Sequence, residues 1–158
     1  MRQRRVDYDV TDSIKTTEAA AVASEGRRIY LDLFQKAEIA TLDRSFADIT
    51  ALYAGEHPDC HACDTDYHDI QHVLDVTLAM ACLLHGYERE GREHVDARMF
   101  SLGVVVGLFH DCGYIRNRRD SRHARGADYT LTHVSRSARY LRRQPPSVAS
   151  ASQGQGFH

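Results

Sequence analysis

The 158-residue chain has the length of one ordinary domain, and its 42% of hydrophobic residues suffice for a single core. The longest nearly unbroken apolar run, LGVVVGLF at residues 102–109, is far shorter than the roughly twenty residues that cross a bilayer, and no secretion signal follows the charged N-terminus. A formal net charge of −2 offers no general basic surface for long nucleic acid, so we expect a cytoplasmic protein that acts apart from membranes.

Helical periodicity dominates the chain from its first third onward. Apolar residues recur three and four positions apart, and the three prolines lie in turn or tail positions, which predicts an all-α fold. After an N-terminal segment, residues 1–23, we expect a helix over about 24–38 with Ser24 as its N-cap and a second helix over about 40–54. We assign residues 24–143 to a single helical domain.

A loop rich in turn-forming residues follows, and it contains a C-x-x-C pair, Cys60 and Cys63. A structural zinc site would need a second pair at comparable spacing, which Cys82 and Cys112 do not provide. The pair is therefore either an incidental feature of the loop or a zinc or redox site without its usual partners. All four cysteines are too few and too scattered for the disulfide framework of a small secreted domain.

The third predicted helix covers about 68–86, with Asp66 as its cap. Its buried stripe is expected to contain Val73, Val76, Met80 and either Leu83 or Leu84. His68 and His72 are four residues apart near the start of this helix. Residues at that spacing share a helix face, so both imidazoles can look into one pocket.

A fourth helix is predicted over about 94–111, and we expect Gly113 to stop it in the left-handed conformation. His110 and Asp111 end its apolar run. A strongly basic loop follows, with arginines at positions Arg116, Arg118, Arg119 and Arg122. Such a loop beside the His-Asp pair would attract the phosphate of a small anionic substrate, although charge alone fits a solvated loop equally well.

The last predicted helix covers about 127–143 and is expected to present an apolar face made of Leu131, Val134, Ala138 and Leu141. Beyond it, residues 144–158 are rich in Ser, Gln and Gly and contain little that could be buried. This composition predicts a disordered tail.

His72, His110 and Asp111 together offer two imidazole nitrogens and one carboxylate. This donor set suits a divalent ion such as Mn, Fe, Co, Ni or Zn, with positions left for water. An ion with open positions lowers the pKa of bound water and supplies hydroxide near neutral pH, which is the nucleophile that hydrolysis needs. The alternative is a hydrogen-bonded His-Asp pair without metal. Taken singly, other histidines are more typical of ordinary polar positions: His57, His61, His85 and His94.

The two histidine segments carry a family resemblance. GLFHDCGY, residues 107–114, resembles the HD motif of the HD superfamily of metal-dependent phosphohydrolases. DYHDIQHVLDV, residues 66–76, resembles the Y-H-N-x-x-H-x-x-D-V stretch of cyclic-nucleotide phosphodiesterases, which belong to that superfamily, with Asp69 in place of the Asn. The similarity covers about 65–143, with the motifs in the family's order. It implies a helical bundle of the HD-domain type that hydrolyses a small, nucleotide-like phosphomonoester or phosphodiester.

The resemblance also implies roles for single residues. Metal ligands carried over from the family are His72, His110 and Asp111, and the implied cofactor is a divalent ion, one of Mn, Fe, Co, Ni, Zn or Mg. His68 becomes the general acid that protonates the leaving oxygen, about one water layer from the ion, so that His68 and Asp111 are the catalytic pair. Related two-metal proteins have further histidines near the positions of His133 and His123, which makes His133 a possible ligand of a second metal and His123 a weaker candidate, since the spacing of both matches only loosely.

The superfamily pattern closes with an Asp on a downstream helix, and no Asp or Glu follows Asp128 in this chain. The resemblance therefore implies an HD fold that is incomplete at its C-terminal end. Two functions remain as alternatives: a metal-dependent phosphohydrolase, or a catalytically incomplete HD protein that binds metal or nucleotide or serves as an interaction module. An acid already present could complete the site, and the candidates are Asp69, Asp120 and Asp128.

Overall fold

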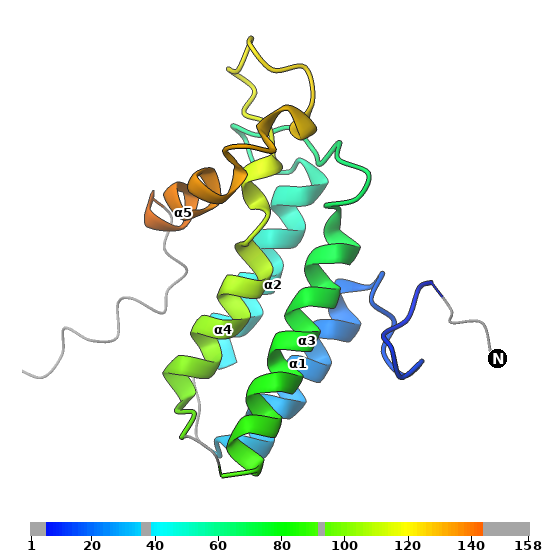
Figure 1. Cartoon of the computed structure of the whole chain (residues 1–158), viewed down its shortest axis with the longest axis vertical. Helices are drawn as coiled ribbons and strands as arrows, with labels where there is room; N and C mark the ends of the chain where they lie inside the picture. Colours follow the sequence, from blue (N-terminus) through cyan, green and yellow to red (C-terminus); the bar gives the residue numbers. More distant parts are fainter. Residues whose placement is uncertain (1–5, 36–38, 92–93, 144–158) are drawn as a thin grey trace, which may run out of the picture.

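The computed structural model describes residues 6–35, 39–91 and 94–143 (Figure 1). Within them the chain forms, in order, α1 Ala19–Leu33, α2 Ile39–Ala54, α3 Ile70–Arg89, α4 Ala97–Phe109, the 3-10 helices η1 Cys112–Tyr114 and η2 Gly126–Tyr129, and α5 His133–Arg143. The described residues contain isolated β-bridges but no β-strand. The prediction of an all-α fold is therefore confirmed.

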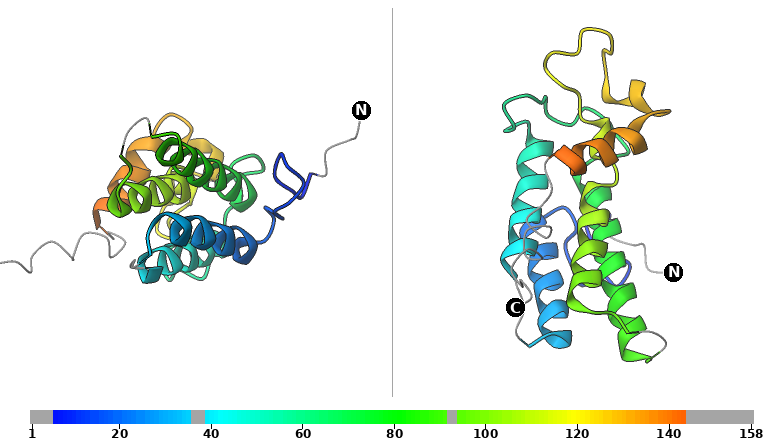
Figure 2. Two further views of the ribbon diagram at one scale, coloured as in Figure 1. Left: turned by 90° about the horizontal axis from the view of Figure 1, so that it is seen from below. Right: turned by 90° about the vertical axis from the view of Figure 1, so that its left-hand side faces the viewer.

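Helices α1 to α4 form a bundle, and α5 lies across one end of it (Figures 1 and 2). In the left view of Figure 2, which looks along the bundle, α1 neighbours α2 and α3, and α4 neighbours the same two helices. The bundle surrounds one hydrophobic core, whose most buried large side chains include Ile29, Ile49, Leu52, Leu74, Phe100, Leu108 and Phe109. No described helix combines the length and the apolar character that crossing a membrane requires.

Two glycines of α4 allow this helix to approach α3 closely. A Cβ atom at Gly103 would lie 2.5 Å from Leu84 Cδ1, and one at Gly107 would lie 3.0 Å from Thr77 Cα. The two glycines are four residues apart and so lie on one face of α4. The start of α3 and the end of α4 are thereby held side by side.

The first helix lies closer to the N-terminus than predicted. The expectation of a helix over 24–38 with Ser24 as N-cap is wrong, since α1 starts at Ala19 and Ser24 is an exposed residue within it. Alanines are strong helix formers, and Val22 is already buried, so packing begins ahead of Ser24. The second helix, predicted over 40–54, agrees with α2 apart from its first residue.

Helix α3 begins later than predicted because Asp69, and not Asp66, caps it. The backbone of Asp69 is extended, and its side chain accepts a hydrogen bond of 2.9 Å from the backbone N–H of His72. His68 therefore precedes the helix and does not share a helical face with His72. The loop still directs both imidazoles to the same place.

Helix α4 ends without a left-handed glycine. It begins at Ala97, after the N-cap Asp96, and its last residue is Phe109, so the predicted bounds of 94–111 extend past both ends. Positive φ among the described glycines occurs at Gly55 and Gly91, so the expected role of Gly113 is wrong. Gly113 is instead required by packing, because a Cβ there would lie 2.0 Å from the carbonyl oxygen of His133.

Two predicted apolar faces are rotated from the observed ones. Helix α3 is covered by both α1 and α4, so its buried residues form a broader band made of Val73, Leu74, Thr77, Leu78 and Ala81. Val76 and Met80 are only partly buried, and of the two alternatives at the end of the stripe Leu84 packs against the core while Leu83 is exposed. The final helix starts at His133 and leaves three of the four predicted apolar positions exposed: Leu131, Val134 and Ala138. It packs through Ser137, Tyr140 and Leu141. The predicted tail, residues 144–158, lies outside the described residues.

Candidate metal centre

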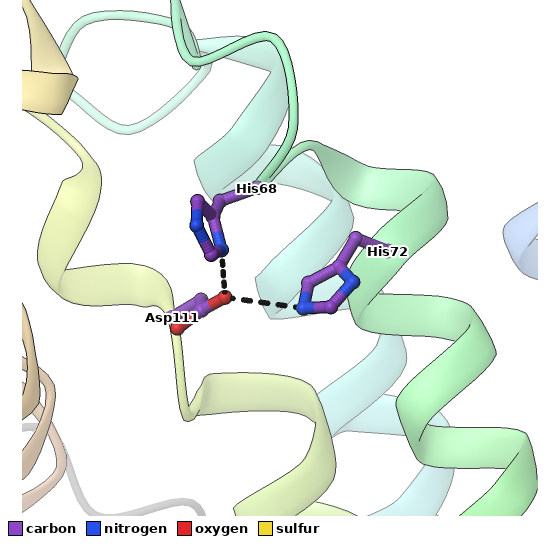
Figure 3. A group of neighbouring side chains, drawn as sticks. All are labelled: His68, His72 and Asp111. Atoms are coloured by element: carbon purple, nitrogen blue, oxygen red, sulfur yellow. Dashed lines mark hydrogen bonds and ion pairs between the residues drawn. The ribbon is translucent and has the colours of Figure 1, made fainter.

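The centre is built around Asp111, which follows the end of α4 and is 3% exposed. His68 and His72, from the start of α3, both approach its Oδ2 atom (Figure 3). His68 Nδ1 donates to Oδ2 at 2.7 Å, and His72 Nε2 lies 3.4 Å from the same oxygen. The three ligand atoms lie within 4.8 Å of one another. Two imidazole nitrogens and one carboxylate at this spacing could hold a metal ion.

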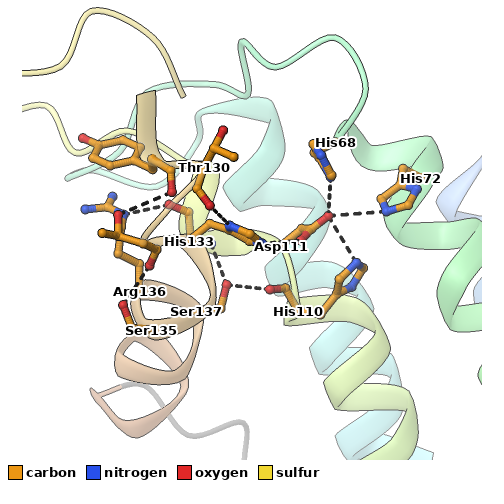
Figure 4. Close-up of polar contacts among 12 residues, drawn as sticks. His68, His72, His110, Asp111, Thr130, His133, Ser135, Arg136 and Ser137 are labelled. Atoms are coloured by element: carbon orange, nitrogen blue, oxygen red, sulfur yellow. Dashed lines mark hydrogen bonds and ion pairs between the residues drawn. The ribbon is translucent and has the colours of Figure 1, made fainter. Parts of the chain in front are cut away.

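Two further histidines approach Asp111 from the end of α4 and the start of α5 (Figure 4). His110 Nε2 lies 3.2 Å from Asp111 Oδ2, and His133 Nε2 lies 3.7 Å from Oδ1. The structure thus brings together His72, His110 and Asp111, as the sequence predicts, and it also brings His133, the further ligand candidate, to the same carboxylate. His68 contacts Asp111 directly, and its predicted distance from a bound ion stays a prediction.

Hydrogen bonds to carbonyl groups fix the tautomers of two of these rings. His110 Nδ1 donates to the carbonyl of Gly107 at 2.7 Å, and His133 Nδ1 donates to that of Thr130 at 2.7 Å. In the neutral ring each Nε2 then carries a lone pair that faces a buried carboxylate. Such a contact is repulsive unless a positive charge lies between the two atoms. A cation would satisfy both lone pairs and the carboxylate, so the donor set fits a metal ion.

The ring of Tyr114 stacks on two of the imidazoles, whose own centroids are 6.3 Å apart. Its ring stacks on His68 with a centroid separation of 4.5 Å and on His133 with a separation of 4.4 Å, and the planes are nearly parallel in both pairs. Tyr114 is 3% exposed and belongs to η1. Contact with this buried ring restricts the rotation of His68 and His133, so Tyr114 is a positioning residue for the centre.

A polar contact fixes α5, and with it His133, against η1 (Figure 4). The hydroxyl of Ser137 donates to the carbonyl of His110 at 2.7 Å and accepts from the N–H of Gly113 at 2.8 Å. Arg136 donates from Nε to the carbonyl of Gly113 at 2.7 Å. These bonds satisfy the backbone N–H and carbonyl groups of the turn after α4, which have no partners in a regular helix.

The cap of α3 offers a test of how the start of this helix positions the centre. Replacing Asp69 by alanine is expected to reduce the free energy of unfolding by about 1 kcal/mol, because an N-cap side chain is lost. It should also weaken Mn²⁺ binding, since the lost hydrogen bond holds the backbone of His72.

The matched control is Asp96→Ala, which removes the equivalent cap from α4, a hydrogen bond of 2.7 Å to the N–H of Met99. Urea unfolding should show similar losses of stability for both variants, while only Asp69→Ala changes the Mn²⁺ affinity. Equal Mn²⁺ affinities in the two variants would contradict the positioning role of the Asp69 cap.

The two downstream acids that could complete the centre stabilise a loop instead. Asp120 accepts hydrogen bonds from the hydroxyl of Tyr129, from backbone N–H groups and from His123 Nδ1. The hydrogen bond from Tyr129, ahead of the others, holds the pKa of Asp120 well below its usual range. Asp128 accepts from two backbone N–H groups just ahead of η2. His123 is held by Asp120, and the structure does not bring it to Asp111.

Two of the four arginines of the basic loop contact neighbouring groups through their side chains. Arg116 Nε lies 3.7 Å from Asp64 Oδ2, and Arg118 donates to the carbonyl of Gly55 at 3.2 Å. Arg119 and Arg122 are exposed. Within the described residues we find no contact between these four side chains and the clustered imidazoles, so their predicted role at the phosphate remains a prediction.

The other histidines and the C-x-x-C pair lie apart from the centre. His85 pairs with Asp32 and His94 with Glu88, as expected of surface positions. Cys60 and Cys63 are free thiols, and the Cys63 thiol donates weakly to the carbonyl of His68 at 3.6 Å. Among the described residues, the one group with metal-ligand spacing contains histidines and Asp111 and no cysteine.

The sequence alone did not identify the residues that hold the histidines of the centre in position. Tyr114, Arg136 and Ser137 have no periodic signal, and their contacts join parts of the chain that are distant in sequence. One sequence feature could have pointed to Tyr114: it is an aromatic residue that lies three positions after Asp111 and directly after Gly113.

Comparisons with protein-family models, with curated proteins and with solved structures found no match.

Proposed function

We propose that the chain binds a divalent metal ion at this centre and acts as a phosphohydrolase of the HD type on a small phosphorylated, nucleotide-like substrate. The observation that carries the proposal is the convergence of four imidazoles on one buried carboxylate. The order of the Y-H-x-x-x-H and H-D segments supports it. The helical bundle, with α5 across one end, is compatible with a domain of the HD type (Figure 1).

Each clustered side chain has a role in this proposal. His72, His110, Asp111 and His133 would hold the ion. When bound, the ion supplies neutralisation of phosphate charge and makes water more acidic near it. His68 is oriented by Asp111 through Nδ1 and by the face of Tyr114, so it can donate a proton from a fixed position to the departing oxygen.

A second candidate function is metal binding without turnover. Within the described residues, Asp111 is the one carboxylate whose oxygens contact the imidazole rings of the clustered histidines. A divalent ion held there would have one balancing negative charge from the protein, which weakens binding and loosens ligand geometry. This observation favours a metal-dependent binding or interaction module over an efficient enzyme.

Both candidate functions require a bound metal ion, so the metal content of the purified protein tests both. The wild-type chain, purified without added metal, is expected to contain a transition metal in near-stoichiometric amount, whereas His72→Ala and His110→Ala should lose it. The control is His85→Ala, because this imidazole lies on α3 but pairs with Asp32. Equal and negligible metal in all four proteins would refute a metal centre.

Turnover separates the two candidates. With Mn²⁺ added, the wild type is expected to hydrolyse a nucleoside 3′,5′-cyclic monophosphate, whose departing alkoxide needs a proton. His68→Ala should then lower kcat by roughly 100-fold while it leaves the metal content unchanged, because only proton donation is lost. A metal-loaded wild type without measurable hydrolysis would exclude the enzyme and leave the binding module.

A further inference from the structure

A second cavity, of about 270 Å³, lies between α5, the end of α2 and the loop segments around residues 57–60 and 115–117. It shares no lining residue with the clustered imidazoles and Asp111. Cys112 and Gly113 line it and directly follow Asp111 in the chain, so the metal centre and this cavity lie on either side of the turn after α4. Neither the sequence motifs nor the proposed chemistry uses it.

Three arginines of α5 line this cavity: Arg136, Arg139 and Arg143. Their spacing of three and four residues places them on one face of the helix. Arg136 is fixed by hydrogen bonds to the carbonyls of Gly113 and Ile115 and lies over the ring of Tyr129. In Figure 4 its guanidinium lies on the far side of Ser137 from the imidazoles. The other two arginines are exposed side chains.

The opposite wall of the cavity is preformed by main-chain pairing. Cys60 forms an isolated antiparallel bridge with Asn117, and the N–H of Arg118 donates to the carbonyl of Asp59 at 2.8 Å. Arginine side chains of α5 and the side chain of Asn117 therefore line the cavity from its two walls.

The charge of the lining is positive at neutral pH. Asp59 is the one acidic residue of the lining against three arginines. Burial raises the pKa of the Cys60 thiol and raises the pKa of Tyr140 to about 12, so these two groups add no negative charge.

We propose that this cavity binds a small phosphate-type oxyanion, either free or as the phosphate of a small ester. Guanidinium groups recognise tetrahedral oxyanions through paired, charge-assisted hydrogen bonds. Arg139 and Arg143 line the cavity beside Arg136, whose own guanidinium is held by two backbone carbonyls. The volume is below that of sites for drug-sized ligands, which favours a small anion over a large organic molecule. This inference does not depend on catalysis at the metal centre.

The test is phosphate binding at constant ionic strength, followed through the rise of Tm with phosphate concentration. The wild-type chain should show saturable stabilisation by inorganic phosphate. Arg139→Gln and Arg143→Gln should each raise the Kd by roughly tenfold, since one charge-assisted hydrogen-bonding group is lost. Arg142→Gln is the matched control, because this arginine also lies in the last turn but is not part of the lining and donates to the carbonyl of Ala138.

Specific outcomes would overturn the proposal. They are the absence of saturable stabilisation in the wild type, or a loss in Arg142→Gln as large as in Arg139→Gln, which would indicate general attraction to a basic helix end. Asp111→Asn should leave the phosphate affinity unchanged, and a loss there would place the anion at the metal centre. Adding methyl phosphate distinguishes the two sources of ligand: similar affinities for both anions support an ester as well as free phosphate as the ligand.

Discussion

Replacing Asp111 by asparagine is expected to weaken Mn²⁺ binding by at least about 100-fold, because loss of a supporting group alone costs about 10- to 100-fold and Asp111 is the shared anion of the centre. The substitution keeps the shape of the side chain and removes its negative charge. Four imidazoles then surround a neutral amide. Titration of Mn²⁺ into the apo protein measures the effect, and circular dichroism checks that the helices are retained.

Asp48→Asn is the control for this charge change, since Asp48 is an exposed residue of α2 and lies apart from the clustered histidines. Its Mn²⁺ affinity should equal that of the wild type. If Asp111→Asn bound Mn²⁺ as tightly as Asp48→Asn does, the cluster would be a metal-free hydrogen-bonded network, and the phosphohydrolase proposal would lose its basis.

The elements that sequence predicts best are those whose signals are local. The bounds of α2 follow from apolar residues three and four apart, and the His-Asp pair at the end of α4 follows from two polar residues that close an apolar run. The predicted start of α3 was wrong because two residues near it could each serve as the N-cap. Asp66 and Asp69 are both good N-caps, and the choice of Asp69 depends on where the bundle holds the start of α3.

The predicted apolar face of α5 failed for a different reason. Its periodicity suggested a helix that packs through Leu131, Val134, Ala138 and Leu141, of which Leu141 packs against the core and the other three are exposed. The helix is also held by the buried hydroxyl of Ser137. A contact made by one buried polar side chain leaves no periodic signal in a sequence. The same is true of Tyr114, whose two stacking partners are far from it along the chain.

The candidate centre could be predicted in part. Histidines at His68, His72 and His110 could be selected from spacing and motif order, and the structure brings them to Asp111. The direct contact of His68 with Asp111 could not be predicted, because it depends on the loop before α3 and on the close approach of α3 to α4 at Gly107.

Replacing Gly113 by alanine is expected to reduce the free energy of unfolding by about 3 kcal/mol, at the upper end of the cost of overpacking. A Cβ there would lie 2.0 Å from the carbonyl oxygen of His133 and 2.7 Å from its carbonyl carbon. Both are backbone atoms, so the first turn of α5 must move as a unit. That movement would break the hydrogen bond from Gly113 to Ser137 and would withdraw His133 from Asp111.

Gly86→Ala is the matched control, because Gly86 lies within α3 and an added Cβ would meet no atom within 4 Å. This variant should gain up to about 1 kcal/mol, since alanine favours the helix more than glycine does. Urea unfolding measures both changes, and Mn²⁺ titration should show weaker binding for Gly113→Ala alone. If Gly113→Ala unfolded at the urea concentration of the wild type, α5 would not pack on the turn after α4, and the position of His133 beside Asp111 would be wrong.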